Sequence, residues 1–214
     1  MGLYLLYFLI IIAVPIIIQL YLRRTYAENS RIPADSGLTG WQVARKILDA
    51  HGLHHVQVEE VPGMLTDHYD PRTKTVRLSR DNFYGTSIAA VSVAAHEVGH
   101  ALQDAEDYAF LRFRHALVPL ASFGSNASFF LIFLGLILSW ADMILLGIIA
   151  MSFAVLFQVV TLPVEFNASA RALDQLVSLN LLGMREEYSA RKVLNAAALT
   201  YVAATVIAVL ELLR

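Results

Sequence analysis

The amino-acid sequence predicts a mainly α-helical, polytopic membrane protein with about four transmembrane helices and a small α+β domain outside the bilayer. Of the 214 residues, 57% are hydrophobic and only 16% carry a charge, which is typical of membrane proteins. Polar residues collect in two segments, 23–115 and 163–192. Four long stretches are nearly free of charge, and we expect them to cross the bilayer: 1–22, 118–140, 143–162 and 193–213.

Composition also excludes several classes of site. The formal net charge is only −2, so nothing indicates a nucleic-acid partner. The chain has no Cys, which rules out disulfides and thiolate zinc sites. A zinc site in this chain must therefore use His, carboxylate and water.

The first apolar stretch, residues 1–22, has no charged side chain and is long enough to span the ~30 Å hydrocarbon core as a helix. It lacks a positively charged start and a small-residue cleavage site before Arg23. We therefore interpret it as a retained anchor, in which Pro15 is tolerated.

The segment 23–115 predicts a small domain. Turn-forming residues between 25 and 40 indicate a linker, and a helix over 41–50 follows, with Thr39 as N-cap and Gly52 at its C-terminal end. Residues 56–61 alternate as in a strand, and 65–79 predict a hairpin that turns at 70–74. The hairpin is either a platform to which an extended peptide adds as a further strand, or only a small structural sheet.

A helix over 86–107 carries the motif around which the chain is organised. His96 and His100 lie four residues apart, so both imidazoles face one side and reach a single Zn²⁺. Glu97 follows the first imidazole and is placed to accept a proton from metal-bound water. Gly99 leaves room for another backbone close to the metal. The alternative is a buried, hydrogen-bonded His pair.

Residues 118–162 predict two membrane spans joined by a tight turn at 139–142. Asp142 is the only charged residue between 116 and 164. Small residues, such as Gly124 and Gly135, favour close packing of these helices.

A third zinc ligand is expected in the segment 163–192, which we interpret as a cytoplasmic helix beginning just beyond the membrane. Apart from the turn residue Asp142, Glu165 is the first carboxylate after His115. Two His and one Glu leave a fourth zinc position for water, as catalysis requires. Alternatively, Glu165 only stabilises a helix N-terminus, and Glu186 and Glu187 are weaker rivals as ligands. Among the other histidines, we expect His68 to be the most relevant, because the predicted hairpin is placed to bring it near the metal.

The distribution of Lys and Arg predicts the orientation in the membrane. Eleven lie between the first and second spans and four between the third and fourth, whereas the remaining connection has none. The positive-inside rule therefore places 23–115 and 163–192 together on the cytoplasmic side of the cell membrane. The last stretch, 193–213, is a fourth span or, alternatively, a peripheral packed helix.

The sequence around 94–103, with 65–79 before it and 165–169 after it, resembles the YugP-like membrane zinc metallopeptidases of bacteria. This resemblance covers nearly the whole chain. The arrangement of the motif is also similar, more distantly, to that of HtpX-type gluzincin proteases. It implies a zincin-like cytoplasmic domain with an HExxH helix, zinc ligands at His96, His100 and Glu165, and Glu97 as base. In gluzincins an Asp commonly follows the Glu ligand by four residues and orients a ligand His. This chain has Ser169 there, and Asp104 is a possible substitute.

These observations predict a membrane-integrated zinc endopeptidase that hydrolyses peptide bonds of membrane or membrane-proximal proteins. Zinc acidifies water and Glu97 transfers the proton to the leaving amine. The oxyanion donors expected are Arg171, His68, Asn167 and Tyr108. The rival functions are a zinc-binding, non-catalytic membrane scaffold or chaperone, and a transporter, which the near absence of charge in the spans disfavours. The oligomeric state is left open.

Overall fold

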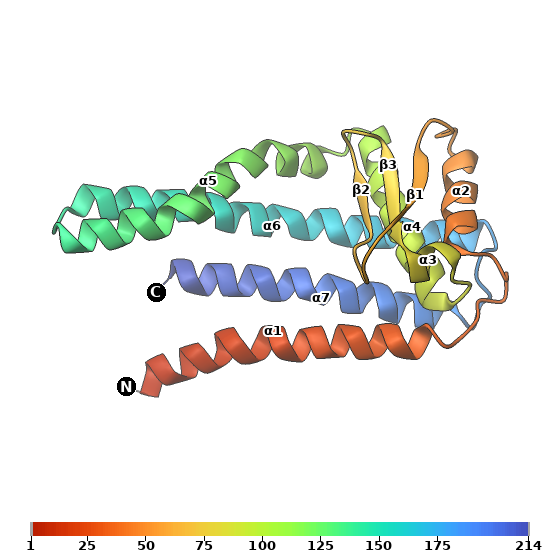
Figure 1. Cartoon of the computed structure of the whole chain (residues 1–214), viewed down its shortest axis with the longest axis horizontal. Helices are drawn as coiled ribbons and strands as arrows, with labels where there is room; N and C mark the ends of the chain where they lie inside the picture. Colours follow the sequence, from red (N-terminus) through yellow and green to blue (C-terminus); the bar gives the residue numbers. More distant parts are fainter. Residues whose placement is uncertain (1, 214) are drawn as a thin grey trace. The chain divides into compact units, whose positions relative to one another are not determined.

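The computed structural model describes residues 2–213, which form seven helices and one three-stranded sheet (Figure 1). The elements follow one another in the order α1 (Gly2–Asn29), α2 (Gly40–Ala50), β1 (Gln57–Val61), β2 (His68–Asp70), β3 (Thr75–Ser79), α3 (Arg80–Tyr84), α4 (Ile88–Ala105), α5 (Ala109–Ile137), α6 (Ala141–Ser178) and α7 (Glu187–Leu212). They form two compact units. The first comprises Met1–Pro15, Ala109–Val164 and Tyr201–Arg214, and the second comprises Ile16–Tyr108 and Glu165–Thr200.

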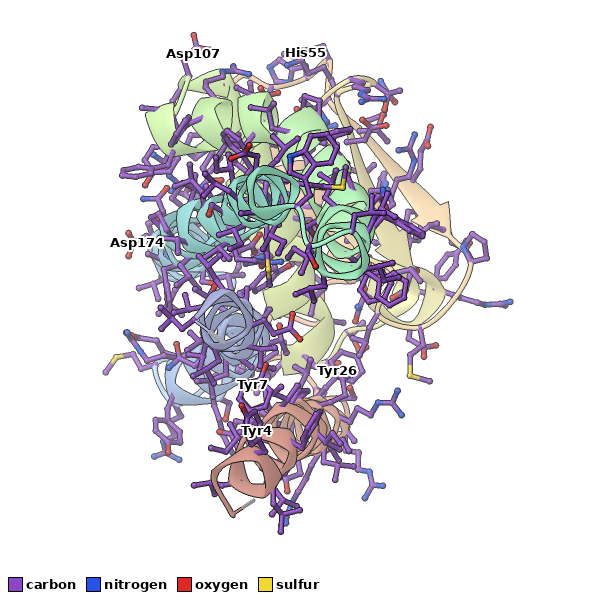
Figure 2. All side chains as sticks on the ribbon, turned by 90° about the vertical axis from the view of Figure 1, so that its left-hand side faces the viewer. Tyr4, Tyr7, Tyr26, His55, Asp107 and Asp174 are labelled. Carbon is purple, nitrogen blue, oxygen red and sulfur yellow. The ribbon has the colours of Figure 1, made fainter. Side chains whose placement is uncertain are left out.

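Four helices are long and apolar enough to cross a membrane: α1, α5, α6 and α7. Many large apolar side chains on them are exposed, as Phe129 and Phe130 on α5 are. The side chains around the N-terminal part of α1, where Tyr4 and Tyr7 are labelled, are mostly hydrocarbon (Figure 2). Such surfaces are stable in lipid and not in water. The predicted fold class is thus confirmed in its mainly helical character and its four candidate spans.

Within the first unit, α5 and α6 approach closely where small residues face them. A Cβ added to Gly124 would lie 2.1 Å from the carbonyl oxygen of Ala150, so only Gly fits there. The turn between the helices contains Ser139 with φ 51°, and the Trp140 N–H donates to the Gly135 carbonyl at 2.8 Å. The predicted tight turn is therefore confirmed.

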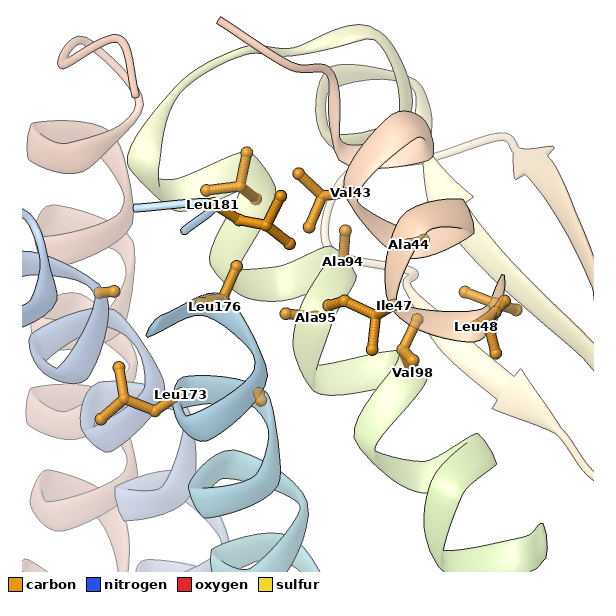
Figure 3. Packing of buried hydrophobic residues seen from close by; sticks show 14 of the residues in the cluster. Val43, Ala44, Ile47, Leu48, Ala94, Ala95, Val98, Leu173, Leu176 and Leu181 are labelled. Atoms are coloured by element: carbon orange, nitrogen blue, oxygen red, sulfur yellow. The ribbon is translucent and has the colours of Figure 1, made fainter. Parts of the chain in front are cut away.

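The core of the second unit forms where α2 packs on α4 (Figure 3). Thr39 caps α2 through a capping box with Gln42, as the sequence predicts for the N-cap. The fully buried side chains of Val43 and Ile47 lie on the α2 face turned toward α4, which presents Val98 and small alanines. Burying each large aliphatic side chain contributes about 1.5–3 kcal/mol. This packing holds α4, the helix with the His pair, at the centre of the unit.

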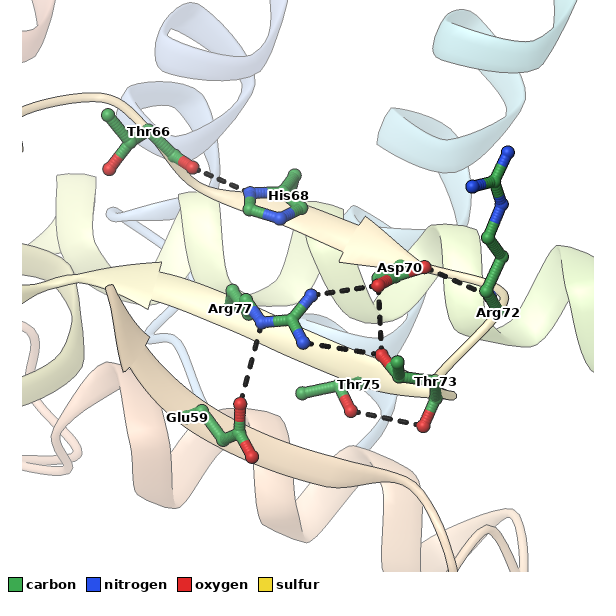
Figure 4. Close-up of polar contacts among 8 residues, drawn as sticks. All are labelled: Glu59, Thr66, His68, Asp70, Arg72, Thr73, Thr75 and Arg77. Atoms are coloured by element: carbon green, nitrogen blue, oxygen red, sulfur yellow. Dashed lines mark hydrogen bonds and ion pairs between the residues drawn. The ribbon is translucent and has the colours of Figure 1, made fainter. Parts of the chain in front are cut away.

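The sheet has the strand order β1-β3-β2. β2 and β3 pair antiparallel, with Tyr69 opposite Val76, which confirms the predicted hairpin. β1 pairs parallel with β3 on its other side, a pairing that the sequence analysis does not predict. Asp70 secures the turn by accepting hydrogen bonds from Arg77 and Thr73 (Figure 4). β2 is consequently an edge strand.

Several boundaries differ from the sequence expectations. α1 continues beyond residue 22 to Asn29, because Arg24 and Glu28 form an i,i+4 ion pair and the Asn29 side chain donates to the Thr25 carbonyl. The predicted linker is correspondingly shorter. α4 begins after Ser87, whose hydroxyl accepts the Ala90 N–H, and the short helix α3 before it is not predicted.

The largest difference concerns the helix expected to begin at Pro163. α6 instead runs without interruption through Pro163 to Ser178, so the segment 163–192 is the end of α6, a connection and the start of α7. A proline removes one backbone donor but is tolerated within apolar helices where neighbouring groups compensate. Glu165 therefore lies in the middle of a helix rather than at a helix N-terminus.

Candidate metal centre

The two histidines of the motif lie side by side on α4. Their ring centroids are 4.8 Å apart, as expected for residues four apart on a helix. Both side chains are nearly buried, with 13% of His96 and 11% of His100 exposed. Both imidazoles are therefore largely shielded from solvent but keep limited access to it.

Glu165 on α6 brings a carboxylate to both imidazoles. Its Oε2 lies 3.2 Å from Nε2 of His96 and 3.5 Å from Nε2 of His100. A zinc ion with bonds of 2.0–2.1 Å in a tetrahedron holds its ligand atoms about 3.3 Å apart. Among residues 2–213, these three side chains form the group whose ligand atoms all lie within 4.8 Å of one another. The spacing thus fits zinc with a fourth position left for water.

Gly99 explains how α6 comes so close to α4. A Cβ added to Gly99 would lie 2.5 Å from the carbonyl oxygen of Ala168, three residues beyond Glu165. The sequence analysis predicts that a small residue here admits another backbone, and the structure confirms it. A larger residue would push the Glu165 helix away from the imidazoles.

The Nδ1 atom of His100 is held by a chain of hydrogen bonds whose polarity can be worked out from its far end. Arg171 Nε is always a donor, so the atom of Asn167 that it contacts at 2.7 Å must be the oxygen Oδ1. That oxygen lies 2.9 Å from Gln103, which must therefore present its NH₂ group to Asn167. Gln103 then turns Oε1 toward His100 Nδ1 at 3.0 Å.

An amide oxygen only accepts, so His100 Nδ1 carries a hydrogen. The neutral ring then has its lone pair on Nε2, the atom that faces Glu165. This is the tautomer that a metal requires at that nitrogen. The donor set therefore fits zinc in its chemistry as well as in its spacing.

His96 has a simpler support. Its Nδ1 lies 3.1 Å from the hydroxyl of Ser169, four residues after Glu165 on α6. A hydroxyl both donates and accepts, so it positions the ring without dictating its tautomer. The predicted contact between Ser169 and a motif histidine is thus present.

Glu97 is buried next to the His pair and has a perturbed acidity. It is 8% exposed, and burial raises the pKa of its carboxyl group to about 7. The positive field of His96 opposes this rise in pKa, while the negative charges of Asp67 and Glu165 add to it. The backbone N–H of Tyr69, on the edge strand β2, donates to the carboxylate. A carboxyl that titrates near neutral pH suits a group that both accepts and returns a proton.

The structure places the other predicted residues in different surroundings. Asp104 accepts hydrogen bonds from the Tyr69 hydroxyl at 2.7 Å and from Lys74, so it joins the hairpin to α4. Arg171 also pairs with Glu106 at 2.8 Å. His68 is exposed on β2, and its Nδ1 donates to the Thr66 carbonyl (Figure 4).

Two residues at the site are missing from the sequence analysis. Gln103 lies three residues after His100, on the same face of α4, and this spacing is a signal that could have identified it. Asp67 raises the pKa of Glu97, and its carboxylate accepts hydrogen bonds from Ser79 and Asn82. No sequence pattern connects Asp67 to the motif, since only the fold of the hairpin brings them together.

Comparisons with known proteins agree with this chemistry. The sequence matches the family described as "Putative neutral zinc metallopeptidase" over residues 4–214. It is 50% identical over 196 residues to a protein of Bacillus subtilis (strain 168) named "Putative membrane protease YugP". The aligned region covers 92% of this chain and 87% of that protein. No solved structure matches the chain.

Proposed function

Because this chain belongs to the neutral zinc metallopeptidase family, we propose that it is a membrane-integrated, zinc-dependent endopeptidase. The observation that carries the proposal is the convergence of His96, His100 and Glu165 at the spacing of a tetrahedral zinc site. Glu97, buried beside them, supplies the proton transfer that peptide hydrolysis needs. Its substrates are peptide bonds of membrane or membrane-proximal proteins.

Each residue has a distinct task in this mechanism. The two imidazoles and Glu165 would hold zinc, which would supply a Lewis acid at the scissile carbonyl and lower the pKa of water to about 7. Glu97 accepts the proton of the attacking water on its carboxylate and passes it to the leaving nitrogen. Gln103 and Ser169 hold the Nδ1 sides of the two rings and so keep each Nε2 directed at the ion.

The hairpin is proposed to bind the substrate. β2 is an edge strand, and the Tyr69 N–H on it already reaches Glu97. An extended peptide added along β2 would bring its backbone to the base through main-chain hydrogen bonds, with little sequence preference. Asp104 supports this arrangement because it fixes Tyr69 and Lys74 to the metal-bearing helix.

The expected oxyanion donors separate into two groups. Arg171 and Asn167 already take part in the chain that orients His100, and we assign them to that support. Tyr108 stays as the proposed donor. His68 is not retained, because it is exposed and next to Tyr69 on β2, so its side chain lies on the face of the sheet opposite to the Tyr69 side chain that contacts α4.

The proposed topology is multi-pass, with the metal centre facing the cytoplasm. Its support is the concentration of Lys and Arg in the two segments that carry the zinc ligands. Because the chain has no Cys, a single introduced cysteine reports its location. Met64 is 71% exposed and is therefore a suitable position. The variant Met64→Cys should resist a membrane-impermeant thiol reagent in intact cells and react with it after lysis. Labelling in intact cells would show that the segment 23–115 lies outside the cell, opposite to the proposed orientation.

The central experiment compares wild type with Glu97→Gln in proteoliposomes. Glu60→Gln, the same change on the exposed β1, is the matched control. We expect all three proteins to retain zinc, and only wild type and the control to cleave an unfolded membrane-protein substrate. If neither wild type nor Glu97→Gln cleaves the substrate although both bind zinc, a zinc-binding scaffold is favoured instead. Equal cleavage by both would remove Glu97 from its role as base.

A further inference from the structure

The second unit contains a large cavity that the proposed hydrolytic chemistry does not use. Its volume is about 1150 Å³, and its walls come from the end of α1, the connection after it, α3 and the residues that lead into α4. α1 contributes one helical face, which includes Gln19, Arg23 and Tyr26. Tyr26 is labelled on α1 in Figure 2. None of the proposed zinc ligands lines this cavity.

Positive charge dominates the lining. Three arginines from three separate segments meet there, namely Arg23 on α1, Arg31 in the following connection and Arg80 on α3, against one carboxylate, that of Asp81. Within residues 2–213, none of these arginines forms an ion pair with a carboxylate of the chain. Three exposed arginines that line one cavity give it a positive field, which attracts an anion.

Arg24 provides an internal contrast. It is the neighbour of Arg23 and sits at the same level of α1, yet it does not line the cavity, and it pairs with Glu28 at 2.9 Å. The chain therefore neutralises the arginine that points away from the cavity and leaves the one that lines it without a protein carboxylate. This difference points to an external anion inside the cavity.

The surroundings of the cavity indicate what carries that anion. Arg23 is the first charged residue after the uncharged stretch 1–22, so the cavity begins where the apolar part of α1 ends. Just before it, Ile16, Ile17 and Leu20 on α1 are more than half exposed. Ser87, the N-cap of the 18-residue helix α4, also borders the cavity and adds the positive end of that helix. A cationic cavity beside exposed hydrocarbon suits an amphiphile.

We propose that this cavity binds the phosphate headgroup of an anionic phospholipid through Arg23, Arg31 and Arg80, with an acyl chain lying along Ile16–Leu20. Guanidinium groups bind phosphate oxygens with two parallel hydrogen bonds, which makes Arg better suited to this ligand than Lys. A soluble phosphate compound shares the headgroup chemistry but would gain nothing from the apolar surface.

The test uses the full-length protein in detergent and native mass spectrometry. Phosphatidylglycerol, phosphatidylcholine and inorganic phosphate are added separately, and retained molecules are counted. The variant R23Q/R31Q/R80Q is compared with R24Q/R72Q/R185Q, which removes the same charge from exposed arginines outside the cavity. We expect wild type to retain phosphatidylglycerol over phosphatidylcholine, and the cavity variant to lose about tenfold in retention. The control should change less than twofold.

Three results would overturn the proposal. Equal losses in both triple variants would mean diffuse surface attraction, and equal retention of the two lipids would mean that the anion is not recognised. Displacement of phosphatidylglycerol by millimolar inorganic phosphate would assign the cavity to a soluble phosphate compound. The three single Arg→Gln variants, with zinc content and thermal unfolding measured alongside, distinguish a lost site from a misfolded chain.

Discussion

The two imidazoles of the candidate metal centre occupy the same face of one helix but have different supports. His96 contacts a single hydroxyl, that of Ser169. His100 begins a chain that passes through Gln103 and Asn167 to Arg171, which is itself paired with Glu106. The first support positions a ring, and the second also decides which nitrogen carries the hydrogen.

This difference shows how a neutral amide takes the place of the carboxylate that more often orients a ligand imidazole. An amide has an acceptor end and a donor end, so it orients a ring correctly only if its own orientation is fixed. Arg171 fixes it, because a guanidinium never accepts a hydrogen bond. We therefore expect His100 to depend on residues remote from the metal, and His96 to depend on its immediate neighbour alone.

The largest effect should come from Glu165→Gln, which removes the carboxylate that both imidazoles share. Loss of one charged ligand should weaken zinc binding by about a hundredfold or more, since each ligand supplies a substantial share of the total. Competition with a chromogenic chelator measures the affinity. Unchanged affinity would show that another group completes the site.

The difference between the two imidazole supports is tested most directly by comparing the variants Gln103→Leu and Ser169→Ala. Loss of the acceptor at His100 Nδ1 should reduce zinc affinity by about 10- to 100-fold. Loss of the hydroxyl at His96 should reduce it by only a few-fold, because a hydroxyl orients the ring less strongly. The same chelator titration measures both variants. A larger loss of zinc affinity for Ser169→Ala than for Gln103→Leu would show that the support of His96 is the more important one.

Gly99→Ala should disturb both rings together. The added methyl would meet the Ala168 carbonyl at 2.5 Å, and relief requires α4 and α6 to separate. We expect a destabilisation of about 1–3 kcal/mol from overpacking, read as a lower unfolding temperature in detergent. Gly2→Ala, where nothing lies within 4 Å, is the control. A variant as stable as wild type would mean that the helices adjust freely.

A smaller effect is expected for Arg171→Met, which leaves the amides of Asn167 and Gln103 free to reverse. Zinc affinity should fall by about three- to tenfold, the low end for outer supports of a metal ligand. Arg171→Lys should retain part of it. The double variant Gln103→Glu/Arg171→Met should regain affinity, because a carboxylate accepts from His100 Nδ1 in either orientation. A purely structural role for Arg171 predicts no such rescue.

The smallest effect is expected from a substitution in the hairpin, which should affect neither imidazole. The Arg77 guanidinium, with the Arg72 N–H and the Thr73 hydroxyl, holds the pKa of Asp70 well below its usual 3.8. The stabilisation is therefore fully present above about pH 4 and declines gradually as the pH falls from there toward the lowered pKa of Asp70. Asp70→Asn should lower the unfolding temperature slightly at pH 7 and by a smaller amount at pH 3, with zinc affinity unchanged. An equal shift at both values would contradict the ionic origin.

The features that the sequence predicts are those with a local signal. Thr39 marks the start of α2, the turn residues between 70 and 74 mark the hairpin, and the i,i+4 spacing places the two imidazoles together. Glu165 is found by elimination, because Asp142 is the only other carboxylate between residues 108 and 173. In each case the relevant residues are neighbours in the chain or rare in composition.

The features that sequence analysis misses depend on packing between distant segments. The parallel pairing of β1 with β3 is set by how the sheet rests on the helices, and alternation does not encode it. Proline usually marks the start or end of a helix, but α6 continues through Pro163. In an apolar environment a continuous helix is the best way to satisfy the hydrogen bonds of the backbone. Gln103 has no charge and no motif, so its importance emerges only from the polarity of its hydrogen bonds.

The second unit is assembled from two stretches of chain, Ile16–Tyr108 and Glu165–Thr200, with the α5–α6 hairpin made in between. On the ribosome the imidazoles are thus synthesised 65 residues before the carboxylate that joins them. A nascent chain that has exposed the HExxH helix still holds an incomplete set of zinc ligands. The candidate zinc site can consequently be completed only after the intervening helices have been made.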